Sequence, residues 1–478
     1  MRRTKIIATL GPSTDKPGMT EKLLLAGVDL FRVNYSHQNQ EDQARRISEI
    51  RELSSRHGRE VGVIADLQGP KIRLTRFSAD KVFLEEGRRF TLDTAMPEDA
   101  GDIEHVGVTY KQLVKDVKQG DRLLLDDGRI VLEVAGVSSN EVNCRVIRGG
   151  ELSSKKGVNL QGGGLAAGAL TDKDRADLAH AAAAGVDYIA VSFVRGREDI
   201  DLARELLGDN SAGIIAKFER AEALTNAEEI IDASDAIMIA RGDLGVEIGD
   251  AALPPVQKRL IKLARDMDRA VITATQMMES MIDHQIPLRA EVFDVANAVI
   301  DGTDALMLSG ETSIGMFPDL VVEAMARIAE ETEKQRITRV SDHRINQRFD
   351  RIDEAIAMST MYAANHISAR AIAALTETGS TSLWMSRIST GIPVFAFTRH
   401  VGTMRKVKLY RGVYPIHFDI THTDPLEANT EIIEELEKLG IVGQGDFVVI
   451  TKGDLRGKRG GTNNMKIVQV GQDLDQTL

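Results

Sequence analysis

The feature that most constrains the fold is a series of eight short apolar runs, each of which ends in polar residues or glycine. Helix-like segments such as EKLLLAGV and PVQKRLIKLAR lie between most of them. Strands that alternate with helices form parallel β-α-β units, and eight such units close into a (β/α)8 TIM barrel. The runs begin at residues 4, 30, 61, 188, 213, 236, 270 and 305. We therefore expect their polar ends to form one ring at the carboxyl end of the barrel, where the active sites of such barrels lie.

The gap between the third and fourth runs is too long for a single helix. It contains short β-rich pieces such as KVFL, RFTLD and EVNCRVI, which are separated by turn residues. We expect residues 69–168 to form a small all-β domain that is inserted after the third barrel strand and covers the mouth as a lid. Residues 1–68 and 169–340 would then form the catalytic barrel.

A second α/β unit is predicted at the C-terminal end. Residues 331–350 have no sustained apolar stripe and are interpreted as a linker. The runs RAIAALTETG, IPVFAFT, VYPIHF and DFVVITKG follow and alternate with helical patterns. This alternation predicts a separate C-terminal α/β domain at residues 353–478, with a regulatory role suggested by the resemblance described below.

Composition narrows the class of protein. The chain has 60 Lys and Arg against 72 Asp and Glu, a net charge of −12, which argues against a nucleic-acid partner because such partners need a basic surface. The one cysteine, Cys144, excludes an internal disulfide and fits a reducing compartment. No stretch approaches the roughly 18 apolar residues that span a membrane, so we expect a cytoplasmic protein without a membrane partner.

Charged side chains stand where an apolar strand should end, in the run IIAKFER. Lys217 and Glu219 are two residues apart, so a strand would point both to one face. Glu219 and Asp243, at the ends of neighbouring strands, suit Mg²⁺ with water or substrate oxygens as its other ligands. Arg32, Arg73 and Lys217 are cations suited to a phosphoryl group.

Each polar residue at the rim also has an ordinary explanation, such as a helix cap or an ion pair, but the clustering favours a site. A Schiff base at Lys217, as in some aldolases, is the main chemical alternative, and it requires a neutral amine. The nearby Glu219 favours the ammonium form, so we interpret Lys217 as a fixed cation. The other candidates at the rim are Asn34, Ser36, His37, Asp66, Gly242, Thr275, Gln276, Ser309, Gly310 and Glu311.

Motifs of the common nucleotide-binding folds give little support. The sequence contains no GxxxxGK[ST] motif of a P-loop. GGGLAA, at residues 162–167, has a GxGxxA spacing, but no strand-to-helix unit surrounds it. We interpret this segment as the hinge of the lid.

A set of ordered motifs resembles the pyruvate kinase family. They are RRTKIIATLGPS, FRVNYSH, GPKIR, KKGVNL, IARGDLGVEI, ATQMMESM, ANAVIDGTD and LSGET, in order from residue 2 to about residue 315. The C-terminal unit is similar to the regulatory domain of that family. The resemblance implies a glycolytic phosphotransferase that transfers the phosphoryl group of phosphoenolpyruvate to ADP and yields pyruvate and ATP. It also implies Mg²⁺ or Mn²⁺ as cofactor and a homotetramer.

The resemblance further assigns roles to the rim. Arg32 would contact phosphoenolpyruvate, as would Gly242, Asp243 and Thr275, and Lys217 would stabilise the transferring phosphoryl group. Glu219 and Asp243 would bind the divalent metal. The donor of the proton to enolpyruvate stays open between Thr275, Ser309 and an ordered water. The residues that would serve the nucleotide or its phosphates are Asn34, Ser36, His37, Arg73 and Lys156.

One motif departs from the family. Many members read DTKGPEIR and use K⁺ as an activating cation, whereas this chain reads DLQGPKIR. Leu67 supplies no hydroxyl ligand, and Lys71 places a cation where the family often has glutamate. We hypothesise that the Lys71 ammonium replaces K⁺ in the region of Asn34, Ser36 and Asp66, so that K⁺ is not required.

The segment ALTETGSTS predicts a strand, a turn and the start of a helix. Backbone N–H groups at a helix N-terminus bind anions, although an ordinary capped helix would have the same pattern. The segment resembles the effector pocket of the family, which implies a sugar-phosphate effector near Thr376, Thr378, Gly379, Ser380 and Thr381. Two other functions stay open: a Mg²⁺-dependent lyase or aldolase on a barrel, and an inactive sensor of sugar phosphates.

Overall fold

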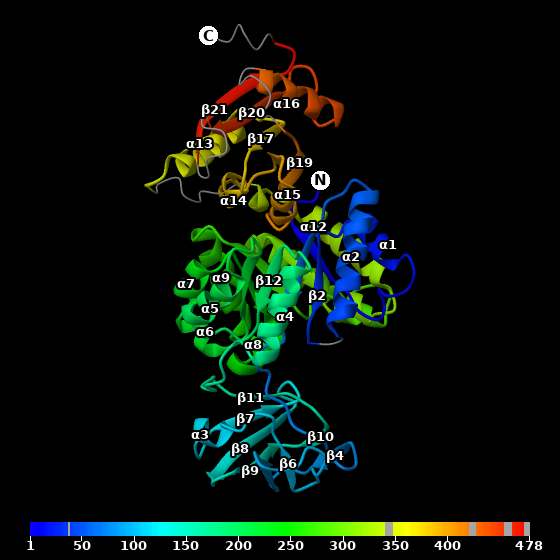
Figure 1. Cartoon of the computed structure of the whole chain (residues 1–478), viewed down its shortest axis with the longest axis vertical. Coiled ribbons are helices and arrows are strands. Elements are labelled where there is room, and N and C mark those ends of the chain that lie inside the picture. Colours follow the sequence, from blue (N-terminus) through cyan, green and yellow to red (C-terminus); the bar gives the residue numbers. More distant parts are fainter. Residues whose placement is uncertain (37–38, 340–347, 420–426, 454–460, 473–478) are drawn as a thin grey trace.

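The computed structural model describes residues 1–36, 39–339, 348–419, 427–453 and 461–472. The molecule is elongated, with a β-rich domain at one end, the barrel in the middle and an α/β domain at the other end (Figure 1). The N-terminus lies beside the α/β domain. In the part of the chain that is described, no helix has the length and apolar character needed to cross a membrane.

The central domain is a closed barrel of eight parallel strands, in the order β1-β16-β15-β14-β13-β12-β3-β2. The predicted barrel is therefore confirmed, and each of the eight apolar runs provides one strand. The strands are apolar on both faces because one face packs on the surrounding helices and the other fills the interior. Their bounds are β1 Lys5–Thr9, β2 Leu30–Asn34, β3 Gly62–Asp66, β12 Tyr188–Val191, β13 Gly213–Phe218, β14 Ala236–Ala240, β15 Ala270–Ala274 and β16 Ala305–Leu308.

Most of the barrel helices are amphipathic and cover the outer face of the strands. In the helix Leu253–Asp266, Leu260, Ile261 and Ala264 are buried, and prolines at its first turn fix the entry of the chain. The helices of this domain are α1 Met19–Ala26, α2 Gln40–Arg56, α4 Asp172–Ala183, α5 Arg197–Leu207, α6 Ala221–Thr225, α7 Ala227–Ala233, α8 Arg241–Ile248, α9 Leu253–Asp266, η1 Glu279–Ile282, α10 Arg289–Asp301, α11 Gly310–Ser313 and α12 Pro318–Thr332.

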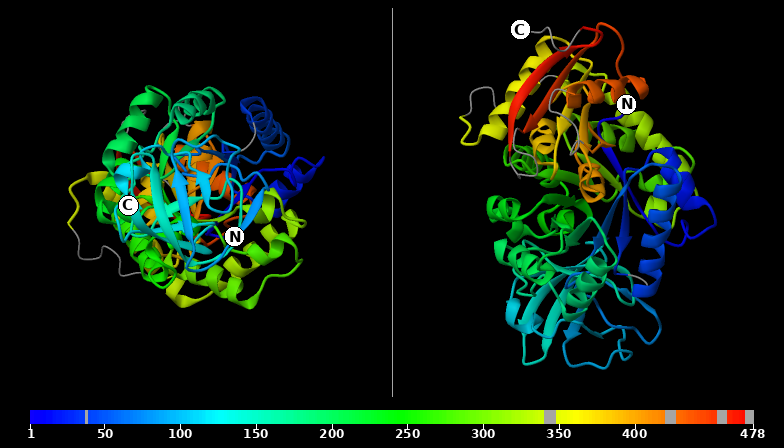
Figure 2. Two further views of the ribbon diagram at one scale, coloured as in Figure 1. Left: turned by 90° about the horizontal axis from the view of Figure 1, so that it is seen from below. Right: turned by 45° about the horizontal axis from the view of Figure 1, so that its top comes forward.

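The chain leaves the barrel after β3 and forms the β-rich domain before it returns at α4. Seen along the long axis, this domain lies in front of the ring of barrel helices (Figure 2, left). It has a two-stranded sheet, β10-β4, and a six-stranded sheet, β11-β7-β8-β9-β5-β6. The boundaries at residues 69 and 168 stay a prediction. Its elements are β4 Lys81–Leu84, β5 Arg89–Asp93, β6 His105–Gly107, α3 Leu113–Asp116, β7 Arg122–Leu125, β8 Ile130–Val137, β9 Glu141–Arg148, β10 Gly150–Ser153 and β11 Val158–Leu160.

The C-terminal domain is a five-stranded sheet in the order β19-β18-β17-β20-β21, with helices on both faces, which confirms the predicted α/β unit. β21, which was not predicted, runs antiparallel to β20. The expected linker begins later than residue 331, because Glu331 and Thr332 still belong to α12. The elements are α13 Ile352–His366, β17 Ala371–Leu375, α14 Ser380–Ser386, β18 Val394–Thr398, α15 Val401–Val407, β19 Val413–His417, α16 Glu427–Lys438, β20 Phe447–Gly453 and β21 Thr462–Gln469.

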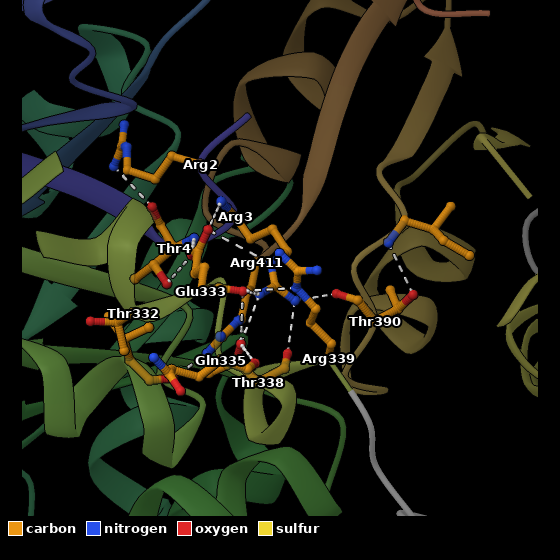
Figure 3. A network of polar contacts seen from close by, with 12 residues as sticks. Arg2, Arg3, Thr4, Thr332, Glu333, Gln335, Thr338, Arg339, Thr390 and Arg411 are labelled. Atoms are coloured by element: carbon orange, nitrogen blue, oxygen red, sulfur yellow. Dashed lines mark hydrogen bonds and ion pairs between the residues drawn. The ribbon is translucent and has the colours of Figure 1, made fainter. Parts of the chain in front are cut away.

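A buried polar network joins the barrel to the C-terminal domain (Figure 3). Glu333 accepts the backbone N–H groups of Arg3, at 2.8 Å, and of Thr4, at 2.6 Å. The Arg3 guanidinium donates to the carbonyl of Thr338, at 2.7 Å, and to that of Thr390 in the C-terminal domain. These bonds satisfy polar groups that would otherwise be buried without partners.

Candidate active site

A buried lysine stands at the carboxyl end of β13, inside the mouth of the barrel. Ile215, two residues earlier, packs in the interior cluster, so strand alternation points Lys217 inward as well. The Lys217 ammonium lies 2.9 Å from Glu219 Oε1 and 3.0 Å from Asp66 Oδ1. It also donates to Ser192 Oγ at 2.6 Å. One cation is thus held by two carboxylates and a hydroxyl.

The surroundings of Lys217 keep its side chain charged. Burial alone would lower the pKa of the amine, but the carboxylates of Asp66 and Glu219 outweigh it and raise the pKa above its usual value. A Schiff base would need the neutral amine at neutral pH. The geometry therefore disfavours the aldolase alternative and favours a permanent cation.

Asp66, at the end of β3, holds two cations at once. Its Oδ2 accepts a hydrogen bond from Arg32 Nε at 2.6 Å, while Oδ1 contacts Lys217. Burial would raise the pKa of Asp66, but Arg32 and Lys217 lower it below the usual value. Arg32 also donates to Thr9 Oγ1 at 3.2 Å. The sequence placed Asp66 at the rim and in the monovalent-cation region, but it did not predict this role.

Glu219 is fixed by a backbone contact as well as by Lys217. Its Oε2 accepts the N–H group of Phe193 at 2.8 Å. Phe193 has φ 57°, a left-handed conformation that is uncommon for a bulky residue and that the carboxylate helps to hold. Burial raises the pKa of Glu219, Lys217 opposes this shift, and Asp243 adds to it. Glu219 directly follows β13 and Asp243 comes shortly after β14, and these two strands are paired side by side in the barrel.

Asp243, on the first turn of α8, faces the cleft between barrel and lid. Its Oδ1 lies 2.8 Å from the ammonium of Lys71. The cleft is lined by both residues together with Asp127, Gly242 and Gln276. Glu219 and Asp243 are therefore two carboxylates, each neutralised by a lysine.

A divalent ion fits this pair of carboxylates. Among the described residues, no group of three or more His, Cys, Asp or Glu side chains could hold a metal. An ion at Glu219 and Asp243 would take its remaining oxygen ligands from water and substrate. Mg²⁺ is usually held in this way, with few protein ligands and several retained waters.

The loop after β15 is strained and firmly anchored. Thr275 and Gln276 have φ values of 67° and 54°. Arg241 donates to both of their carbonyls, at 2.7 and 3.0 Å, and forms an ion pair with Asp294 at 2.8 Å. Thr275 Oγ1 in turn accepts the N–H group of Gly242 at 2.9 Å. Arg241 and Asp294 were not predicted, because Arg241 anchors a loop that is remote in sequence and Asp294 contacts that loop only through Arg241.

Comparison with known proteins identifies the family. Residues 1–322 match the family model described as pyruvate kinase, barrel domain, and residues 354–468 match pyruvate kinase, alpha/beta domain. The chain belongs to the pyruvate kinase family. It is therefore a phosphotransferase, and membership implies phosphoenolpyruvate, ADP, pyruvate and ATP as substrates and products, with a divalent metal.

Several pyruvate kinases resemble the whole chain. Pyruvate kinase II of Salmonella typhimurium is 51% identical over 476 residues, which cover 98% of this chain and 99% of that protein. The pyruvate kinase of Haemophilus influenzae is 49% identical and covers 95% and 96%. The crystal structure of a pyruvate kinase from Cryptosporidium parvum superimposes with a TM-score of 0.90, at 32% identity, and covers 98% of this chain and 96% of that one.

The predicted nucleotide residues lie on the lid and at the end of β2. Arg73 donates to the carbonyl of Lys155 at 3.1 Å, and Lys156 forms an ion pair with Asp126 at 2.7 Å. At the end of β2, Asn34 Oδ1 accepts the N–H group of Ser36 at 3.1 Å. His37 lies outside the described residues.

Lys71 contacts the predicted metal ligand. Its ammonium lies against Asp243, and no hydrogen bond or ion pair joins it to Asn34, Ser36 or Asp66, all of which are described. The structure thus brings Lys71 together with Asp243 and leaves the predicted monovalent-cation residues without a contact to it.

The predicted effector loop follows β17. Thr376 Oγ1 accepts the N–H group of Gly379 at 2.8 Å, and the hydroxyls of Thr378 and Ser380 are 3.0 Å apart. Thr381 Oγ1 lies 2.8 Å from the hydroxyl of Thr462 on β21. Gly379 has φ 87°, which only glycine adopts easily. The loop is a hydroxyl-rich turn at the start of α14.

Proposed function

We propose that the Lys217 site transfers the phosphoryl group of phosphoenolpyruvate to ADP, with the Lys217 ammonium as a fixed cation beside the group in transit. The observation that carries this proposal is the buried ammonium between Asp66 and Glu219. Phosphoryl transfer depends mainly on positioning and charge neutralisation, which a preorganised buried cation supplies. Arg32, held by Asp66, would orient the phosphate of the substrate.

Glu219 and Asp243 would hold Mg²⁺ or Mn²⁺. The bound ion would neutralise charge on the phosphoryl oxygens and on the developing enolate. The Lys71 ammonium forms an ion pair with Asp243. When a metal ion binds to Asp243, the ammonium would have to share that carboxylate with the ion or move away from it. Arg73, Lys156, Asn34, Ser36 and His37 are proposed to bind the nucleotide, with Arg73 and Lys156 carried by the lid.

Enolpyruvate must then be protonated, and the hydrogen bonds favour Ser309 or a water over Thr275. The Thr275 hydroxyl already donates to the carbonyl of Ala274 at 2.6 Å. The buried Ser309 hydroxyl has no hydrogen-bond partner among the described residues. The hydrogen-bonding capacity of Ser309 is therefore unused by the protein, as a relay of a proton between a water and the enolate would require.

A coupled assay for pyruvate tests the proposed reaction. Pyruvate is expected to form only with phosphoenolpyruvate, ADP and a divalent ion together, and to stop when ADP is omitted or the ion is chelated. Pyruvate formed without ADP would exclude phosphoryl transfer to the nucleotide and favour a lyase.

We further propose that K⁺ is not required. The support is the apolar Leu67, which is buried where other members place a hydroxyl. Lys71 adds a permanent positive charge at the mouth of the barrel, although its ammonium lies against Asp243 and not against the predicted monovalent-cation residues. Turnover should be equal in K⁺ and in tetramethylammonium at matched ionic strength. Strict dependence on K⁺ would contradict this proposal.

Allosteric control is proposed at the loop that contains Thr376, Thr378, Gly379, Ser380 and Thr381. Its hydroxyls and the start of α14 would hold the phosphate of a sugar-phosphate effector. Calorimetry with a panel of sugar phosphates tests this site. The absence of both binding heat and any kinetic effect would contradict it.

A homotetramer in the cytoplasm is also proposed. Exposed apolar side chains that gather in one region indicate a protein interface, and two regions of the chain carry several such side chains. Sedimentation velocity should give a mass near four chains, and a monomer would exclude the proposal. The exposed residues are Ile286, Leu288, Phe293, Ile314 and Met316 near α10, and Ile352, Tyr362, Phe447 and Ile467 on the C-terminal domain.

A further inference from the structure

Two arginines between the barrel and the C-terminal domain donate to carbonyl and hydroxyl oxygens and form no ion pair with a described carboxylate. Arg265, on α9, donates to the carbonyl of Arg387 at 2.8 Å and to Ser389 Oγ at 3.3 Å. Arg411, just before β19, donates to the carbonyl of Val299 at 2.8 Å. Among the described residues, no carboxylate lies within ion-pair distance of either guanidinium.

The nearby carboxylates are already engaged. Asp304 forms a two-pronged ion pair with Arg387, and it accepts the backbone N–H group of Arg411, at 2.9 Å, rather than its guanidinium. Glu333 accepts the backbone N–H group of Arg3. Four buried or half-buried guanidiniums therefore share two carboxylates.

The excess of guanidiniums over carboxylates is accompanied by lowered pKa values of Arg265 and Arg411. Burial lowers the pKa of Arg411 to about 10. Burial also lowers the pKa of Arg265, and the positive charge of Arg387 lowers it further. Buried charges are stable only when they are paired, so the interface is short of negative charge.

The two guanidiniums line one small cavity together with Arg3. Arg3 and Arg265 come from the barrel, whereas Arg411 comes from the C-terminal domain. Figure 3 shows Arg3, Arg411 and Thr390 in the same region of the interface. The hydroxyls that line the cavity are those of Ser386, Ser389 and Thr390.

We propose that this cavity binds a phosphate dianion, which bridges the barrel and the C-terminal domain. Planar guanidinium forks and hydroxyls are the donors that suit a tetrahedral oxyanion. The small cavity suits free inorganic phosphate better than the phosphate group of a larger metabolite. The site is separate from Lys217 and from the proposed effector loop, so it does not rest on either of them.

Calorimetry with inorganic phosphate on the full-length protein tests the site. Arg265→Met and Arg411→Met should each weaken binding by about tenfold or more, because each removes a charge-assisted donor. The matched control is Arg259→Met, an exposed arginine on the same helix, which should change the affinity by less than about twofold. Lys217→Met should leave this binding unchanged.

Thermal melting separates a ligand site from a merely structural role. In chloride buffer, Arg265→Met should melt no lower than the wild type, because the variant loses an unpaired buried charge. At equal ionic strength, phosphate should raise the melting temperature of the wild type but not of Arg265→Met. The proposal would be overturned if Arg265→Met melted below the wild type in chloride and phosphate restored its melting temperature.

Two further results would overturn it: no phosphate binding by the wild type, or binding that persists in both Arg265→Met and Arg411→Met. Binding of glycerol 3-phosphate shows whether the cavity takes free inorganic phosphate or the phosphate group of an ester. If glycerol 3-phosphate binds through the same arginines but more weakly than inorganic phosphate, the free ion is the occupant. Tighter binding through them would support the site and identify a phosphate ester.

Discussion

At the scale of single residues, the active site depends on Asp66 as much as on Lys217. Asp66 is almost wholly buried and contacts both Lys217 and Arg32. Strand alternation alone could predict that the side chains of Lys217 and Glu219 point to the same face. The partners Asp66 and Ser192 could not, because they come from other strands and only the closure of the barrel brings them near.

Asp66→Asn should therefore harm both stability and turnover. Removing one member of a buried ion pair leaves the other charge uncompensated, so we expect the free energy of unfolding to fall by about 3–5 kcal/mol. Turnover should fall by at least about tenfold, because Arg32 and Lys217 lose their anchor. Urea denaturation and the pyruvate assay measure the two effects.

The control for this variant is Asp209→Asn, an exposed aspartate after α5. A surface change of this kind should stay within about 0.5 kcal/mol of the wild type. Equal effects of Asp66→Asn and Asp209→Asn would contradict the anchoring role of Asp66.

At the scale of elements, the eight barrel strands and the main strands of the C-terminal domain followed from hydrophobic runs. The strands β6, β10 and β11 did not, because their sequences HVG, GELS and VNL each contain only one or two apolar residues and form no apolar run. β21 was missed because its sequence, TNNMKIVQ, is polar at one end and only partly buried. The strained loop after β15 was also hidden, since its anchor Arg241 lies on α8.

Arg241→Met should loosen that loop. The variant loses donors to the carbonyls of Thr275 and Gln276 and the ion pair with Asp294. We expect turnover to fall by about tenfold to a hundredfold, with a higher KM for phosphoenolpyruvate, because small displacements of a reacting geometry are costly. Arg289→Met, an exposed arginine on α10, is the control, and equal kinetics in the two variants would contradict the anchoring role.

At the scale of the whole molecule, buried cations join the barrel to the C-terminal domain. Lys5, on β1, donates to the carbonyl of Val413 at 2.6 Å, and its ammonium lies 4.4 Å from the centre of the Tyr414 ring. Burial outweighs these contacts and lowers the pKa of Lys5 to about 7 from the ordinary 10.5. Nothing in the run TKIIATLG predicts this, since the C-terminal domain supplies the burial.

The contribution of Lys5 to stability should consequently rise with pH between about 7 and 10.5. In this range the unfolded chain binds more protons at Lys5 than the folded chain, so a higher pH favours folding by about 1 kcal/mol per pH unit. Lys5→Met lacks this contribution. Urea denaturation from pH 7.5 to 9.5 measures the free energy of unfolding of both proteins. The value for Lys5→Met minus the value for the wild type should decrease as pH rises. A difference that does not change with pH would contradict the assigned pKa of Lys5.

The most direct test of the central claim is the turnover of Lys217→Met in the pyruvate assay, beside Lys22→Met, an exposed lysine on α1. Loss of a preorganised cation at the developing charge should lower kcat by at least about 10²–10³, with unchanged folding by circular dichroism. Lys22→Met should match the wild type. Turnover of Lys217→Met within about twofold of the wild type would contradict the account.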